Sequence, residues 1–490
     1  MGPTIAARRL SAILGAMIVR RIYDPNLAQA AYLVGCSETR EALVIDPACD
    51  IDRCLSLAAQ LGLRIVAVAE THVHADFVSG VCGFLAHHAV TAFVSAEGPE
   101  SPWMASVATA PGARLARIRA GDSFRVGTLE FTARHTPGHT RESLSFEVEG
   151  TSNGTKLLFS GDFLFAGDVG RPDLGAFATE GLSLKEGLEK LRDSLASLDD
   201  LPLDTQVLPG HGAGSECGRS ICNMPATTIG IERVINRAMR AHAEGGDFAQ
   251  AVMGGAAEPP PYFARVKRLN EHGGRALAGT PEVAELAPEA FEALVQRTDV
   301  AIIDTRSWND FLDSRLPYAI SAPFERSFGP TVANYLEEDD LVALIAPRAQ
   351  VAEIARVLLR VGVAPESILG FVEPAAVAEL GAANFVVHGV DDISPVRAHE
   401  LVERGAATVV DVRTCREFAA GHLPGATHIP YTHLRARIGD IPRDRPVLCY
   451  CRSGNRSARA AALLAREGLD ALNMRGGYWP YEGRGFTVER

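Results

Sequence analysis

Residues 70–77 read Glu70-Thr71-His72-Val73-His74-Ala75-Asp76-Phe77 and decide the fold of the first half of the chain. The apolar run Ile65-Val66-Ala67-Val68 stands just before them and predicts a buried strand. Two alternate histidines and an aspartate on the loop after a strand can converge on one cation. The stretch therefore predicts a metal site at a strand end of an α/β domain.

Three more signals of this kind follow in order along the chain. They are Thr136-Pro137-Gly138-His139-Thr140, Phe159-Ser160-Gly161-Asp162 and Pro209-Gly210-His211-Gly212. A single histidine near a strand end is usually structural or solvated. Four such segments in this order predict one shared site.

The four segments resemble the metallo-β-lactamase superfamily, and within it the persulfide dioxygenase branch related to glyoxalase II, over residues 17–275. The resemblance implies an αββα sandwich. Glyoxalase-type members carry His-x-His-x-Asp-His and hold two metals, whereas this chain has Phe77 in place of the final histidine. Phenylalanine cannot ligate a metal, so a mononuclear centre is the simpler interpretation.

The same branch implies one Fe(II) per chain, held by His72, His139 and Asp162. Two imidazoles and one carboxylate leave positions open for O₂ and substrate. Ligand identity alone also permits zinc. Three further residues, His74, Asp76 and His211, would orient the ligands or hold water by hydrogen bonds. The alternative is that they only stabilise their loops.

The substrate side of the site is expected in two segments. Residues 167–173 resemble the Gly-Arg-x-Asp segment of the branch, where Arg171 pairs with an anionic substrate group and Asp173 braces the loop. A solvated arginine is the alternative. Cys217 follows His211 closely and is expected to hold a substrate sulfur, or to be an inert buried thiol.

The second half of the chain contains an internal duplication. Val300–Ile303 and Thr408–Val410 predict strands that end on Asp304 and Asp411, roughly 107 residues apart. Residues 280–388 and 393–490 are therefore expected to be two related α/β domains with parallel sheets.

The second copy carries Cys451-Arg452-Ser453-Gly454-Asn455-Arg456-Ser457 between a strand and a helix. Backbone N–H groups of a helix start, with Arg452 and Arg456 nearby, favour a thiolate that can carry sulfur as a persulfide. The same donors suit sulfite or thiosulfate.

This copy resembles the single-domain rhodanese family over residues 393–490, which implies that Cys451 is the nucleophile and that the two arginines assist it. Phosphatases with Cys-x5-Arg loops share the geometry, but Cys451 to Arg456 is one residue too short for them. The first copy has no cysteine, because none occurs between Cys222 and Cys415. It is expected to be an inactive rhodanese-like domain.

The bulk composition limits partners and location. The net charge of −12 over 490 residues argues against nucleic acid, and nine scattered cysteines fit reduced thiols in the cytoplasm. No stretch of about 18 apolar residues predicts a membrane span. The first sixteen residues are expected to be a loose extension, with an organellar presequence as the alternative. The sequence leaves the oligomeric state open, and a homo-oligomer is one possibility.

The two resemblances together imply a persulfide dioxygenase and sulfurtransferase for sulfide or persulfide detoxification. A thiol persulfide and O₂ would give sulfite and thiol, and Cys451 would exchange sulfur with sulfite or thiosulfate. A second hypothesis is a zinc-dependent, glyoxalase II-like thioester hydrolase fused to a sulfurtransferase. A third is a non-enzymatic sulfur carrier or persulfide sensor with a vestigial metal site.

Overall fold

The chain forms two compact units, residues 1–256 with 263–280 and residues 257–262 with 281–490. The structure is a computed structural model that describes residues 11–14, 17–100, 103–107, 109–150, 154–177, 183–314, 316, 318–381 and 390–490. The expectations for residues 1–10, 15–16 and 382–388 lie outside the described residues. The three predicted domain boundaries stay predictions.

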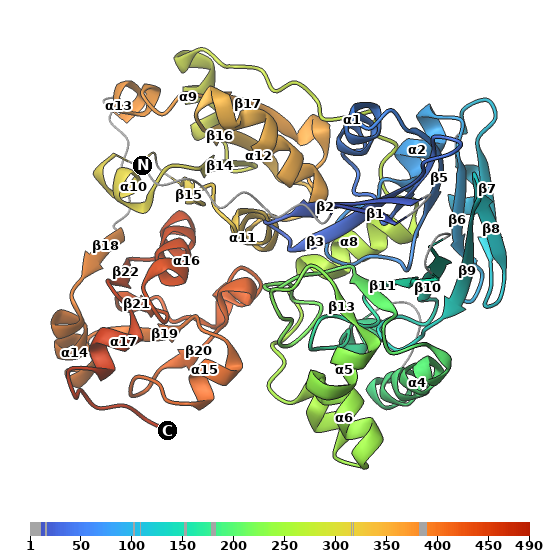
Figure 1. Ribbon diagram of the computed structural model, residues 1–490. Coiled ribbons are helices and arrows are strands. Elements are labelled where there is room, and N and C mark those ends of the chain that lie inside the picture. The colour runs from blue at the N-terminus through green and yellow to red at the C-terminus, as the bar shows by residue number, and fades with distance from the viewer. Residues whose placement is uncertain are drawn as a thin grey trace. The chain divides into compact units, whose positions relative to one another are not determined.

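The first unit contains two sheets (Figure 1). The first sheet has the order β1 (Ser11–Leu14), β2 (Met17–Asp24), β3 (Gln29–Cys36), β4 (Glu41–Ile45), β5 (Arg64–Ala69), β6 (Thr91–Ser95), β7 (Arg114–Ile118). The second has the order β13 (Thr227–Thr228), β12 (Gln206–Pro209), β11 (Lys156–Gly161), β10 (Leu144–Glu149), β9 (Leu129–His135), β8 (Ser123–Val126). Strands β4 to β7 pair in parallel, as do β11 and β12.

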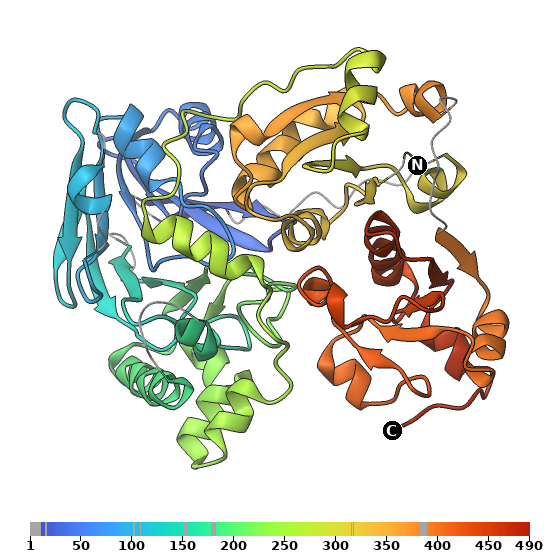
Figure 2. The same cartoon turned by 180° about the vertical axis from the view of Figure 1, so that it is seen from behind.

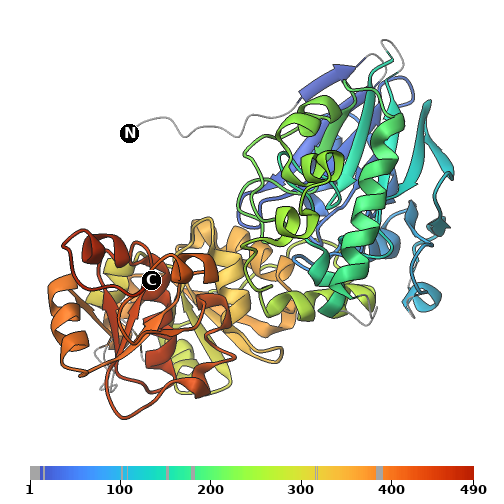
Figure 3. The same cartoon turned by 90° about the horizontal axis from the view of Figure 1, so that it is seen from below.

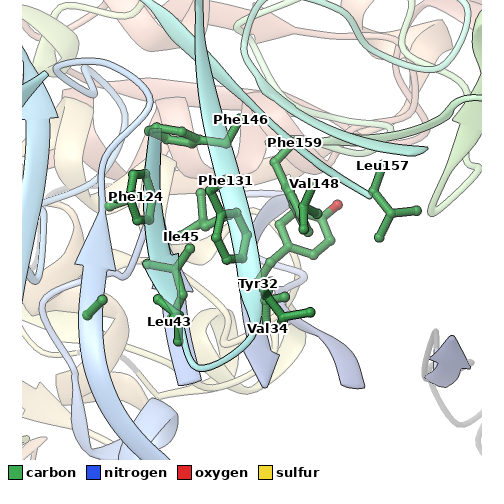
Figure 4. Packing of buried hydrophobic residues seen from close by; sticks show 14 of the residues in the cluster. Tyr32, Val34, Leu43, Ile45, Phe124, Phe131, Phe146, Val148, Leu157 and Phe159 are labelled. Carbon is green, nitrogen blue, oxygen red and sulfur yellow. The ribbon is translucent and has the colours of Figure 1, made fainter. Parts of the chain in front are cut away.

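The main core of this unit lies between the two sheets (Figure 4). Every second residue of β3 and β4, such as Tyr32 and Leu43, faces aromatic side chains from the other sheet, such as Phe131 and Phe159. The rings of Tyr32 and Phe159 meet edge to face at 5.2 Å. This alternation of inward residues closes the sheets face to face.

Helices cover the outer faces of both sheets, so the predicted αββα sandwich is confirmed (Figure 3). The first sheet packs against α1 (Asp52–Gln60) and α2 (Val81–His87), with α3 (Trp103–Ser106) at its side. The second packs against α4 (Leu184–Ala196), α5 (Ile229–Ile235), α6 (Arg237–Glu244) and α7 (Phe248–Met253). The turns η1 (Pro172–Phe177) and η2 (Ser197–Asp200) flank α4, and α8 (Tyr262–Glu271) ends the unit.

The expectation of a loose N-terminal extension is wrong for residues 11–14. They form β1, which pairs with β2 in the register Ser11 to Arg20. The backbone ladder of an edge hairpin orders this short apolar run, which sequence composition alone does not reveal. Among the described residues, no helix has the length and apolarity needed to cross a bilayer.

The second unit contains two separate sheets, and all their strands pair in parallel (Figure 2). The first has the order β15 (Ile320–Ser321), β14 (Val300–Asp304), β16 (Leu341–Ile345), β17 (Ile368–Val372), with helices α9 (Pro288–Val295), α10 (Trp308–Asp313), α11 (Phe328–Tyr335), α12 (Arg348–Arg360), α13 (Ala376–Gly381) and the turn η3 (Pro365–Ser367). The second has the order β18 (Val390–Ile393), β22 (Ala471–Met474), β21 (Val447–Tyr450), β19 (Thr408–Asp411), β20 (Thr427–His428), with α14 (Pro395–Glu403), α15 (Cys415–Ala419), α16 (Asn455–Arg466), α17 (Tyr478–Glu482) and the turns η4 (Tyr431–His433) and η5 (Ile438–Asp440). The predicted parallel sheets are confirmed.

Candidate functional site

Three of the four predicted segments begin where a strand of the first unit ends, and together the four meet at one point. His72 follows β5, His139 lies between β9 and β10, Asp162 follows β11 and His211 follows β12. The ligating atoms of His72, His139 and Asp162 all lie within 4.8 Å of one another, and all three residues are buried. The carboxyl ends of strands from both sheets thus bring the three predicted ligands together.

The distances around Asp162 Oδ2 are those of groups that share a cation. His72 Nε2 lies at 3.8 Å and His139 Nε2 at 3.4 Å from this oxygen. Ligands at about 2.1 Å from one metal ion are roughly 3 to 3.5 Å apart. His211 Nε2 also lies 3.4 Å from Asp162 Oδ2, as close as His139, although the sequence placed it outside the ligand set.

The other ring nitrogen of each histidine has a hydrogen-bond partner, and this partner sets the tautomer. His139 Nδ1 donates to the carbonyl of Arg171 at 2.9 Å, and His211 Nδ1 donates to the carbonyl of Ala28 at 3.2 Å. The Thr71 hydroxyl donates to Asp46, so its oxygen accepts from His72 Nδ1 at 2.9 Å. All three rings therefore present an unprotonated Nε2 to the centre.

Burial keeps the imidazoles of His72 and His139 neutral. It lowers the pKa of His139 to about 3 and that of His72 well below its ordinary value, and neighbouring positive groups lower both further. Burial also raises the pKa of Asp162 to about 6, against the lowering effect of His211. Neutral imidazole is the form that binds a metal.

The arrangement fits a metal ion. His72 Nε2, His211 Nε2 and both oxygens of Asp162 are buried and have no hydrogen-bond partner among the described residues. Lone pairs that face one another in a buried site repel unless a cation lies between them. Two imidazoles and one carboxylate match the set that binds mononuclear iron, and they also accept zinc.

His74 turns away from this centre. Its Nε2 lies 3.2 Å from Asp46 Oδ1, and its ring packs on Phe77 with centroids 4.2 Å apart. Burial alone would lower the pKa of His74, but the Asp46 carboxylate raises it to about 9. Phe77 is 1% exposed. Phe77, the residue at the position where the sequence predicted a missing metal ligand, is thus buried against the His74 ring.

A second buried group adjoins the first. Ligating atoms of Asp76, His211 and Cys217 lie within 4.8 Å of one another, and His211 Nε2 is 3.3 Å from Asp76 Oδ2. Burial raises the pKa of the Cys217 thiol well above its ordinary value, and the carboxylates of Asp76 and Asp162 raise it further. Cys217 therefore lies beside the metal pocket in its protonated form.

Arg171 binds within its own loop. Its Nε and Nη2 donate to the two carboxylate oxygens of Asp173 at 2.7 and 2.6 Å, and its side chain is 5% exposed. Its backbone N–H donates to Cys217 while its carbonyl accepts from His139. The geometry favours the bracing role predicted for Asp173, and Arg171 links a ligand to the Cys217 loop.

Two residues that the sequence did not indicate support the metal loop. Asp46 follows β4, has φ 52°, and accepts from the backbone N–H and hydroxyl of Thr71 at 2.7 and 2.9 Å. Asn270 of α8 donates to the carbonyls of His74 and Phe77, both at 2.8 Å, and accepts from the Ser79 N–H. A lone aspartate after a strand was the available signal for Asp46. Asn270 had none.

A cavity of about 350 Å³ opens onto His72. Trp103, Met104 and Val94 give it an apolar side, and Glu70 and Glu142 give it an acidic side. Lys267 of α8 is 4% exposed. Burial lowers the pKa of His72 and of His139, and the positive charge of Lys267 is one of the groups that lower both further. The cavity offers room for a small molecule beside His72.

The second predicted site lies between β21 and α16. Cys451 is fully buried, and its Sγ accepts from the Gly454 N–H at 3.1 Å. Gly454 has φ 98°, a left-handed conformation that only glycine adopts easily, and a side chain there would strike the backbone of Gly476. The Ser457 hydroxyl lies 3.5 Å from Sγ. The Gly454 N–H and the Ser457 hydroxyl therefore lie next to the thiol.

Neither predicted arginine binds Cys451 directly. The Arg452 guanidinium stacks over the Trp479 ring at 4.0 Å. Arg456 forms two hydrogen bonds of 2.8 Å with the carboxylate of Glu417. Partial burial alone would raise the pKa of Glu417, but Arg456 lowers it to about 2. Arg456 fixes the start of α16 and adds positive charge near the thiol.

We expect the Arg456–Glu417 pair to make stability depend on acid pH. Because the folded pKa of Glu417 lies below its unfolded value, the stabilisation is complete above about pH 4.5 and is lost as pH falls toward 2. Glu417→Gln should reduce the free energy of unfolding by about 2 kcal/mol at pH 7 and by much less at pH 3. Urea unfolding at both pH values measures this. Glu400→Gln, an exposed partner of Arg397, is the control, and an equal loss at both pH values would refute the assignment.

The related domain that contains β14 to β17 has no cysteine at the corresponding loop. Between β16 and α12 it has Ala346 and Pro347. Arg306 pairs with Asp304 after β14, as Arg413 pairs with Asp411 after β19, at 2.6 Å in both. The frame of the duplicated domain is retained without its nucleophile.

Two family models match the chain. Residues 25–211 match the metallo-beta-lactamase superfamily, and residues 394–482 match the rhodanese-like domain. The chain is 30% identical over 184 residues to mitochondrial persulfide dioxygenase ETHE1 of Bos taurus, which is 36% of this chain and 66% of that protein. The match to the Mus musculus protein covers 62% of its length. The chain thus spans slightly less than two thirds of these relatives.

Two further matches cover nearly the whole of the other protein. A sulfurtransferase of Allochromatium vinosum is 37% identical over 101 residues, which is 20% of this chain and 94% of that protein. The crystal structure of a metallo-beta-lactamase from Staphylococcus aureus superposes with a TM-score of 0.63 and 30% identity, over 73% of this chain and 99% of that chain.

Proposed function

The chain belongs to the metallo-β-lactamase superfamily, with a domain related to persulfide dioxygenase and a C-terminal rhodanese-like domain, and on this basis we propose that it is an iron-dependent persulfide dioxygenase and sulfurtransferase. The observation that carries the proposal is the buried set of His72, His139 and Asp162, with Phe77 where a second metal would need a ligand.

In the first reaction, a thiol persulfide, O₂ and water give the thiol, sulfite and two protons. Fe(II) held by His72, His139 and Asp162 would supply the redox chemistry for O₂ at this site. The carrier thiol would lie in the cavity beside His72, with its apolar part on Trp103 and Met104. The buried Lys267 would attract the anionic persulfide.

The protein around the metal site holds the ligands in one protonation state. The carbonyls of Arg171 and Ala28 fix the protons of His139 and His211 on Nδ1. Cys217, protonated and buried next to Asp162, would contact the sulfur of the substrate. Asp76 would orient His211 by its 3.3 Å contact.

In the second reaction, Cys451 carries sulfur as a persulfide. The lone pair of sulfite attacks the outer sulfur, the bond between this sulfur and Sγ breaks, and its electron pair stays on Sγ as a thiolate. The product is thiosulfate, and the reverse reaction uses the same groups. The Gly454 N–H would stabilise the leaving thiolate. Such a protein would serve sulfide or persulfide detoxification in the cytoplasm.

Metal analysis and oxygen uptake on anaerobically purified protein test the proposal. We expect about one iron per chain and O₂ consumption that depends on added thiol persulfide. Removal of the metal with a chelator should abolish uptake, and Fe(II), but not Zn(II), should restore it. Zinc in the native protein, with thioester hydrolysis and no oxygen consumption, would refute the proposal and support the hydrolase.

A further inference from the structure

Within the second unit, the cysteine-less domain covers one face of α16, the helix that follows the Cys451 loop. Arg459, Ala462 and Arg466 lie on this face at helical spacing. Ala462 belongs to the hydrophobic cluster of the cysteine-less domain. Arg466 donates to the carbonyls of Val300 and Tyr318 at 3.4 and 3.1 Å. The catalytic helix is therefore packed against the inactive domain along its length.

The buried Arg459 ties this face to α11. Its guanidinium donates to the hydroxyls of Ser327 and Thr331 at 2.6 and 3.2 Å and pairs with Glu325. It is 4% exposed. Thr331 and Tyr335 are one helical turn apart on α11, so both side chains point to the same side. Helix α11 also contacts the turn η4 of the catalytic domain.

Tyr335 lies on the same side of α11 as Thr331, which contacts Arg459 of the helix that follows the Cys451 loop. The charges of Arg459 and Cys451 are among those that act on its phenol. Its side chain is 1% exposed, and its hydroxyl has no hydrogen-bond partner among the described residues. Burial raises the pKa of Tyr335 well above its ordinary value, so the phenol remains a hydrogen-bond donor.

A buried hydroxyl without a partner is costly, and such groups are rare unless a ligand completes them. Cys449 is a strand residue, and burial raises the pKa of its thiol. The thiol therefore stays protonated and does not require a hydrogen bond from Tyr335. Two hydrogen-bond acceptors are expected near the Tyr335 hydroxyl during sulfur transfer. They are the outer sulfur carried by Cys451 and the sulfite or thiosulfate anion that exchanges it. Arg459 is already bound to three partners and leaves the phenol as the free donor.

We propose that Tyr335 of the cysteine-less domain binds the sulfur anion at Cys451. This inference rests on the sulfur transfer proposed above. Its hydroxyl donates a hydrogen bond to the outer sulfur of the Cys451 persulfide or to an oxygen of sulfite or thiosulfate. The hydroxyl neither gains nor loses its proton in the transfer. This explains why a domain without a nucleophile is retained beside the catalytic one.

Tyr335→Phe tests the proposal, because it removes only the unpartnered hydroxyl. We expect kcat/KM for sulfite, with Cys451 loaded as persulfide, to fall about tenfold or more, as for the loss of one hydrogen bond to a charged group. The melting temperature should stay the same or rise. Thiosulfate should protect Cys451 of the native protein from iodoacetamide at concentrations that do not protect the variant. Tyr318→Phe, at a 49% exposed tyrosine of the same domain, is the control.

Native transfer rates and equal protection in Tyr335→Phe would overturn the proposal. A fall in activity accompanied by a similar fall in melting temperature would show a structural role and would overturn it as well. Failure of the proposed sulfur transfer has a different signature: the native protein would form no thiosulfate and would not be protected by it.

Discussion

Asp162→Ala is expected to lose the bound metal and to reduce persulfide-dependent oxygen uptake by at least about 100-fold. Changing a residue that only hydrogen-bonds a metal ligand costs up to about 100-fold, and loss of a ligand itself should cost at least as much. Asp162 Oδ2 lies within 4 Å of the Nε2 atoms of His72, His139 and His211, so its removal takes away the carboxylate that all three imidazoles share. Oxygen-electrode assays and metal analysis of the variant measure both effects.

Sulfur transfer through Cys451 is the internal control for Asp162→Ala. The variant should transfer sulfur at the native rate. Asp76→Asn is the matched comparison, since Asp76 contacts His211 and lies in the adjoining group. It should retain about one metal per chain and lose at most about 100-fold in oxygen uptake. Full oxygen uptake by Asp162→Ala would contradict the ligand assignment.

Cys451→Ser is expected to reduce sulfur transfer between thiosulfate and sulfite or cyanide acceptors by about 1,000-fold or more. A serine hydroxyl cannot carry sulfur as a persulfide, and the loop around Gly454 holds no other thiol in its place. Oxygen uptake with a thiol persulfide should be unchanged. With thiosulfate as donor and cyanide as acceptor, the thiocyanate and sulfite formed, followed by ion chromatography, measure the loss.

The exposed Cys415 of the same domain provides the control, and Cys415→Ser should transfer sulfur at the native rate. If Cys451→Ser kept transfer while Cys415→Ser lost it, the assignment of the nucleophile would be wrong. The two variants Asp162→Ala and Cys451→Ser should therefore separate the two activities of one chain.

The sequence predicted those parts of the fold that depend on the pattern of neighbouring residues along the chain. The strands β5, β14, β16 and β19 show as short apolar runs, of which β14 and β19 end on an aspartate, and the loops after strands of the first unit carry the predicted ligands. The parallel strands β11 and β12 place their carboxyl ends at one edge, which groups Asp162 with His211. His72 follows β5 of the other sheet and joins them only when the two sheets pack face to face. The same pattern of a strand followed by a helix locates the Cys451 loop.

The parts that sequence did not predict depend on contacts between distant segments. Asn270 holds the metal loop from nearly 200 residues away, and no local pattern distinguishes it from other helical asparagines. Asp46 has a positive φ, and its carboxylate contacts Thr71 and His74, which lie more than 20 residues away in the sequence. Tyr335 has the pattern of an ordinary core aromatic until α11 is placed beside α16.

Charge arguments from sequence were the least specific. Arg452 and Arg456 lie next to Cys451 in sequence, yet one stacks on Trp479 and the other binds Glu417. Arg171 likewise binds Asp173. An arginine side chain reaches several partners, and the geometry of the fold selects among them.

The most direct test of the central claim is the stoichiometry of the native chain supplied with a thiol persulfide and oxygen alone. If sulfite made at the metal site receives sulfur through Cys451, two persulfides and one O₂ should yield one thiosulfate, and Cys451→Ser should instead yield one sulfite for each persulfide and O₂. Persulfide loss without oxygen consumption, or sulfite as the sole product of both proteins, would contradict the account.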